Sequence, residues 1–105
     1  MSPLERYLRH LTVERGLSKN TLAAYRADLA KYADFLEAAD AEPMTASHLD
    51  LEEFSNRLTE SGFRASSRAR ILAAVRGFHK FLALEGLRED DPTSRLRQPK
   101  LPSRL

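Results

Sequence analysis

Apolar residues recur at steps of three and four along four stretches of the chain, which is the spacing of a buried stripe on an α-helix. The first stretch runs from about Pro3 to Arg15, and Gly16 ends it. The second runs from Lys19 to about Ala39, with Ser18 as its predicted N-cap. The predicted buried stripe of this second helix is Leu22, Tyr25, Leu29, Tyr32 and Leu36.

Two further helices are predicted in the second half of the chain. One starts near Thr45 or Ser47, ends at the turn around Gly62, and has a predicted buried stripe of Leu49, Phe54 and Leu58. The other begins at Ser66 or Ser67 and closes at Gly86, and its predicted stripe is Ile71, Leu72, Val75, Phe78 and Leu82. No stretch alternates with a period of two, so no strand is expected. The pattern predicts an all-α domain over residues 1–87.

The periodicity ends after Leu87. Residues 88–105 contain three of the five prolines, and four basic residues follow Asp91 without any acid. We interpret this segment as an extended, basic linker. A sequence that stops in a linker also indicates a fragment of a larger protein, with a further domain expected beyond it.

Composition narrows the class of protein. The 105 residues, 42% of them hydrophobic, suffice for one small domain with a single core. The absence of cysteine excludes a disulfide scaffold, a thiolate zinc site and a cysteine nucleophile. No apolar run approaches the roughly 20 residues of a membrane-spanning helix. We therefore expect a soluble, cytoplasmic protein without a membrane partner.

Charge is distributed unevenly, although the net charge is only +2. Residues 1–31 carry six bases against three acids, whereas residues 32–63 carry one base against eight acids. Residues 64–84 then carry five bases and no acid. Basic blocks on both sides of an acidic middle indicate a polyanionic partner for one face of the protein.

The residues that could support catalysis are poorly placed for it. His10, His48 and His79 fall on three different predicted helices, and none has a second histidine one helical turn away to form a metal pair. His79 lies near the apolar stripe of its helix, which is typical of a packed histidine. Glycine-rich phosphate loops and nucleophile elbows are also missing. We expect no catalytic residue, no metal and no cofactor in this chain.

Nucleic-acid binding has better support. Opposite its apolar stripe the fourth helix carries Ser66, Arg70, Ala73, Gly77 and Lys80, so small residues alternate with bases on a rod that fits the major groove. The second helix carries Asn20, Ala24, Ala27 and Lys31 in the same position, with Arg26 on the flank. Its first turn adds hydroxyl, amide and ammonium donors to the outward N–H groups, which favours a phosphate. The candidate DNA-binding residues are Ser18, Lys19, Asn20, Thr21, Arg26, Lys31, Arg64, Ser66, Ser67, Arg70, Lys80 and Lys100.

A helical protein–protein interaction module without DNA binding remains the alternative interpretation. The acid-free run from Arg64 to Leu84 favours nucleic acid, because a protein interface does not require it. A helix-turn-helix repressor fits less well, since an acidic helix separates the two basic ones. If the DNA-binding interpretation is right, replacing Lys19 or Arg70 by alanine should weaken binding and leave stability nearly unchanged.

Two stretches carry a family resemblance, "GLSKNTLAAYRADL" and the tail "DDPTSRLRQPKLPSRL". With them, nearly the whole chain resembles the N-terminal core-binding domain of tyrosine recombinases, most closely the Xer recombinases and the XerD type among them. The resemblance implies a four-helix SAM-like orthogonal bundle that forms half of a clamp on double-stranded DNA. It also implies that the second and fourth helices face the major groove, and that Ser18, Lys19, Asn20, Thr21, Arg26, Ser66, Ser67 and Arg70 occupy the groove-facing helix starts.

The resemblance extends to the parent protein. It implies a site-specific recombinase, acting in chromosome dimer resolution or DNA integration, that exchanges strands through a 3′-phosphotyrosyl intermediate without a metal or cofactor. The catalytic residues would lie in a C-terminal domain beyond Leu105, so this chain would be inert on its own. Sister recombinase subunits, one of them XerC-like, would be partners of the full-length protein, and the isolated fragment would be monomeric.

Overall fold

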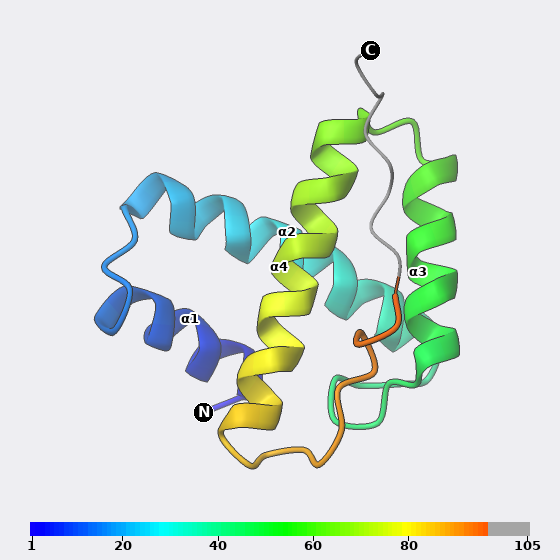
Figure 1. Cartoon of the computed structure of the whole chain (residues 1–105). Coiled ribbons are helices and arrows are strands. Elements are labelled where there is room, and N and C mark those ends of the chain that lie inside the picture. The colour runs from blue at the N-terminus through cyan, green and yellow to red at the C-terminus, as the bar shows by residue number, and fades with distance from the viewer. Residues whose placement is uncertain (97–105) are drawn as a thin grey trace.

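Four helices make up the folded body, as the spacing of the apolar residues predicts. In the computed structural model, which describes residues 1–96, α1 spans Pro3–Val13, α2 spans Lys19–Ala38, α3 spans His48–Glu60 and α4 spans Ala65–Leu84 (Figure 1). No strand occurs within residues 1–96. The all-α prediction is confirmed, with α1 ending at Val13 instead of Arg15. None of these four helices has the length and apolar character needed to cross a membrane.

Serine residues begin three of the four helices. Ser18 caps α2 by accepting a hydrogen bond from the Thr21 amide at 3.2 Å, as predicted. Ser47 caps α3 in a reciprocal capping box with Asp50. The predicted start of the fourth helix at Ser66 or Ser67 is late by one or two residues: α4 begins at Ala65, and its N-cap is Arg64, whose side chain makes no capping hydrogen bond. Ser66 and Ser67 therefore lie inside the first turn of α4.

The core is centred on α4, which crosses α2 near the middle of the molecule (Figure 1). All five residues of the predicted α4 stripe are buried, and Ala74, His79 and Phe81 are buried beside them. On α2 the second half of the predicted stripe is buried, whereas Leu22 and Tyr25 are half-buried and pack against the edge of the core. A broad apolar surface on α4 thus holds the other three helices around it.

The stripe predicted for α3 is wrong at one position. Leu49 is 75% exposed, and the buried residue is Leu51, with no exposed surface. The physical reason is the helical period: Leu51, Phe54 and Leu58 follow steps of three and four, whereas Leu49 and Phe54 are five residues apart and lie on different sides. Helix α3 lies at the side of the bundle opposite the start of α2 (Figure 1).

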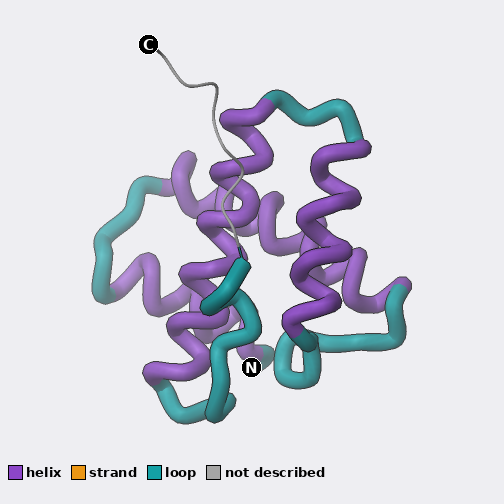
Figure 2. The backbone as a smooth tube through the Cα atoms, turned by 45° about the vertical axis from the view of Figure 1, so that its right-hand side comes forward, coloured by secondary structure: helices purple, strands orange, loops and turns teal. Residues whose placement is uncertain are grey.

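Residues 88–96 differ from the extended linker that the sequence predicts, because they pack against the helices. Arg88 donates hydrogen bonds to the carbonyl oxygens of Pro43 and Ala46, and its side chain is only 10% exposed. Arg76 of α4 donates to the carbonyl oxygens of Thr93 and Leu96. The segment runs back along the bundle after α4 (Figure 2) and buries the Leu96 side chain in the core. Such contacts depend on tertiary packing and leave no periodic signal in the sequence.

Candidate nucleic-acid interface

An ion pair joins α2 to α4 where the two helices cross. The Arg70 guanidinium donates from Nε to Asp28 Oδ2 at 3.0 Å and from Nη2 to Asp28 Oδ1 at 2.8 Å. The Asp28 side chain has no exposed surface, whereas that of Arg70 is 51% exposed. The hydrogen bonds from Arg70 to the carboxylate raise the pKa of Arg70 above its ordinary value. Arg70 is thus anchored on one side and open to solvent on the other.

Lys31 lies on the same side of α2 as Asp28, three residues further along the helix. Its ammonium nitrogen is 5.7 Å from the centre of the Phe63 ring, which precedes α4. Lys31 of α2 thus reaches the residue that precedes α4, while Arg70 of α4 reaches Asp28 of α2. We call Asp28, Lys31, Phe63 and Arg70 the crossing surface.

The pairing of Arg70 corrects the sequence-based expectation about stability. Removing the guanidinium would leave the Asp28 carboxylate buried without its partner, which is strongly destabilising in proteins. Arg70→Ala should therefore lower stability by well over the roughly 0.5 kcal/mol of an ordinary surface substitution. Lys19 is exposed, and for it the original expectation stands.

The start of α2 exposes the polar groups that the sequence places there. Ser18 Oγ accepts from the Thr21 amide and donates to Thr21 Oγ1 at 3.0 Å, so these two side chains satisfy each other. Lys19 and Asn20 are exposed, and the amides of a first turn have no acceptor within their own helix. This helix start can therefore offer backbone N–H groups and one ammonium to an anion.

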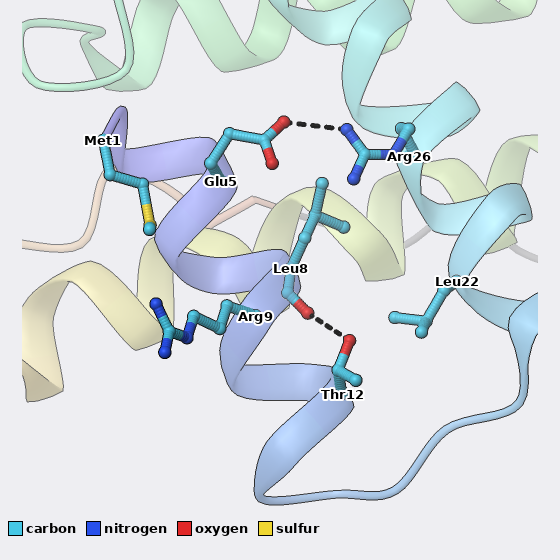
Figure 3. A pocket seen from close by; sticks show the side chains of 7 residues that line it. All are labelled: Met1, Glu5, Leu8, Arg9, Thr12, Leu22 and Arg26. Carbon is cyan, nitrogen blue, oxygen red and sulfur yellow. Dashed lines mark hydrogen bonds and ion pairs between the residues drawn. The ribbon is translucent and has the colours of Figure 1, made fainter.

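Arg26 lies away from the crossing surface. It forms an ion pair with Glu5 of α1, with 2.7 Å between Nη1 and Oε1, and both side chains are about half exposed. Figure 3 shows this pair at the rim of a small pocket between α1 and α2. On the helical wheel Arg26 is about 160° from Asp28, so the structure does not bring it together with Lys31 and Arg70.

The predicted outer face of α4 is exposed at four of its five positions. Ser66, Ala73 and Lys80 are exposed together with Arg70, and Lys80 lies about 15 Å along the helix from Arg70. Gly77 does not belong to this face, because a Cβ at Gly77 would overlap the Tyr7 hydroxyl of α1. The glycine is thus explained by helix packing and not by approach to a duplex. Arg64 is exposed, Ser67 is half-buried, and Lys100 lies outside the described residues.

Asp28 and Phe63 are the members of the crossing surface that sequence reasoning missed, and Asp28 is the charged one. The one signal in the sequence is that Asp28 is a charged residue next to Leu29 of the apolar stripe. That signal predicts an ion pair only once the position of Arg70 is known.

Among residues 1–96, no group of histidine, cysteine and acidic residues is arranged to hold a metal ion. His79 is fully buried and bonded to Tyr32, which confirms its interpretation as a packed histidine.

Comparison with known proteins gives a consistent match. The family model described as phage integrase, N-terminal SAM-like domain, matches residues 4–86. A tyrosine recombinase XerD of Yersinia pestis is 44% identical over 102 residues, which cover 97% of this chain and 34% of the relative. The tyrosine recombinase XerD of Chlorobaculum tepidum is 43% identical over 98 residues, which cover 93% of this chain and 32% of that relative. This chain thus spans about a third of the length of these curated relatives, and no solved structure matches it.

Proposed function

The chain belongs to the family of phage integrase N-terminal SAM-like domains, and from this membership we propose that it binds double-stranded DNA through α2 and α4. The observation that carries the proposal is that a base from each helix reaches across to the other element: Arg70 of α4 is held by Asp28 of α2, and Lys31 of α2 lies over Phe63, just before α4. The small exposed residues Ser66 and Ala73 beside Arg70 leave room for a duplex to approach. The acidic helix α3 lies on the side away from the start of α2 (Figure 1), so it would not oppose a polyanion there.

The proposed contacts are mainly with phosphates. The first turn of α2 offers Lys19 and outward amides, the crossing surface offers Lys31 and Arg70, and Lys80 adds a charge further along α4. Contacts of this kind position a protein on the duplex without reading its sequence. Binding by this domain alone should then be weak, with a dissociation constant on the order of 10⁻⁴ to 10⁻⁶ M at physiological salt.

We extend the proposal to the parent protein by way of its relatives. At a third of their length, the chain corresponds to the N-terminal part of a XerD-type tyrosine recombinase. The catalytic residues would lie outside this chain, which would act as half of a clamp around the recombination site. The partners of the whole protein would be duplex DNA and sister recombinase subunits.

Salt-dependent DNA binding by point variants tests the proposal. Fluorescence anisotropy with a labelled duplex at several salt concentrations should give an affinity that falls steeply with salt. Lys19→Ala and Lys31→Ala should each weaken binding and reduce the slope of log affinity against log salt by about 0.9, the value for one phosphate contact.

Arg6→Ala provides the matched control, because it removes the same charge from a different surface. Arg6 lines a pocket with Phe81 and Glu85, about 22 Å along α4 from Arg70. Its substitution should change affinity little. Equal losses for all three variants, or an affinity that is independent of salt, would contradict DNA binding through α2 and α4. Binding to an acidic protein column without retention on heparin would instead favour a protein-interaction module.

A further inference from the structure

The Asp28–Arg70 pair combines a buried acid with a half-exposed base. Within residues 1–96, Asp28 is the one fully buried carboxylate. It accepts from Arg70 through both oxygens, across 42 residues of sequence and between the two helices assigned to the DNA-binding surface. Burial of an unpaired carboxylate costs several kcal/mol, so the pairing holds the guanidinium strongly in one place.

The geometry of the pair leaves part of the guanidinium available. Arginine has five N–H donors in one plane, and Asp28 uses one on Nε and one on Nη2. The remaining three N–H groups lie toward the Nη1 side of the plane. The Arg70 side chain is 51% exposed, and its neighbours one turn away, Ser66 and Ala73, are small and exposed. A phosphate could therefore approach that edge without displacing Asp28.

We propose that Asp28 is a positioning residue that holds Arg70 by one edge so that its free edge binds a phosphate of the DNA backbone. Planar, bidentate donation is the geometry in which arginine recognises phosphate. An arginine that is already oriented loses less side-chain entropy on binding than a free one. The inference rests on the proposed function, since it assigns a role to an acid within the DNA-binding surface.

Electrostatics and positioning predict opposite effects for Asp28→Asn. The substitution removes a negative charge next to the proposed DNA surface, so charge alone predicts tighter binding. If Asp28 positions Arg70, the loss of the charged acceptor releases the guanidinium, and binding becomes weaker by about 5- to 10-fold, the equivalent of roughly one ordinary net hydrogen bond. The sign of the change therefore decides between the two.

The test uses Asp28→Asn, Arg70→Lys and the double variant in the same anisotropy titration, at a temperature where circular dichroism shows all of them folded. Lysine keeps the charge but cannot donate along two edges of one plane. Arg70→Lys should weaken binding about as much as Asp28→Asn, and the double variant should bind no more weakly than Arg70→Lys. If Asp28 had a purely structural role, Asp28→Asn would instead weaken binding further in a protein that already carries Arg70→Lys.

Each outcome separates the two proposals. If the wild-type chain binds duplex with the expected salt dependence but Asp28→Asn binds as tightly or tighter, the positioning role is overturned and DNA binding stands. If Asp28→Asn does not fold, Arg70→Lys still decides, because unchanged affinity would show that no bidentate contact is made. If the wild-type chain does not bind duplex, the proposed function itself fails.

Discussion

Acidification should destabilise the protein through one buried histidine. His79 has no exposed surface and lies on α4, with Nε2 2.7 Å from the hydroxyl of Tyr32 on α2. Its Nδ1 is buried without a partner in the described part of the chain. Burial, helped by the positive charge of Arg88 and opposed by Asp91 and Asp90, lowers the pKa of His79 to about 4. The native state therefore keeps this imidazole neutral well below the usual pKa of histidine.

The sign and size of the effect follow from proton linkage. Above pH 6.5 the imidazole is neutral in both states, so the stability it supports is fully present. Between pH 6.5 and about 4 the unfolded chain binds a proton that the native state does not bind, so the free energy of unfolding falls as the pH falls. At 1.36 kcal/mol per pH unit, this loss amounts to about 3 kcal/mol across the window, a large part of the 5–15 kcal/mol of a typical domain. Below pH 4 the histidine contributes no further loss.

Urea denaturation at several pH values between 7 and 4.5 measures this contribution against the variant His79→Gln. Glutamine keeps a polar group near Tyr32 but does not titrate, and His10 and His48 are common to both proteins. The stability advantage of the wild type over His79→Gln should shrink by about 2 to 3 kcal/mol as the pH falls from 7 to 4.5. An advantage that stays constant with pH would refute the assignment of a neutral, buried His79.

Two further predictions concern packing. Gly77→Ala should destabilise the protein despite the better helix propensity of alanine, because the new Cβ overlaps the Tyr7 hydroxyl. Tyr7→Phe should relieve that overlap, since the ring carbon Cζ would remain 3.6 Å from the new Cβ. The double variant should then recover about 1 kcal/mol of stability from the helix propensity of alanine. Thermal denaturation of the two single variants and the double variant checks this, and a double variant no more stable than Gly77→Ala would contradict it. Leu51→Ala should lower the free energy of unfolding by about 2–5 kcal/mol, whereas Leu49→Ala should change it by no more than about 0.5 kcal/mol, as measured by urea denaturation. Equal losses for the two variants would mean that α3 packs through a different face.

Much of the fold could be predicted because it is local. Helix spacing in the sequence identified the whole buried stripe of α4, since apolar residues three and four apart must share a face. Ser18 before a periodic run identified the start of α2, because a serine oxygen can accept the unpaired amide of the first turn. The predicted stripe was wrong on α3, where Leu49 was chosen although Leu51 is the leucine that keeps steps of three and four with Phe54 and Leu58.

The candidate interface was predictable only in part. The helical wheel identified the small and basic residues on α2 and α4, among them Arg70, which contacts Asp28 of α2, and Lys31, which lies over Phe63 just before α4. It could not find that Arg26 faces α1 or that Gly77 lies under Tyr7. A helical wheel considers one helix at a time. The surroundings of Arg26 and Gly77 depend instead on which neighbouring helix covers each side of α2 and α4.

The sequence by itself determined the helical class, the start of α2 at its Ser18 cap and the basic character of two helix faces, because these follow from interactions within one or two turns. Only the tertiary structure decided that Asp28 pairs with Arg70, and that Arg76 and Arg88 hold residues 88–96 against the helices. The reason is that a buried charge or an unpaired carbonyl is satisfied by whatever donor the crossing helices bring within about 3 Å. Helix-crossing geometry is a property of the whole packed core, and no local pattern of residues encodes it.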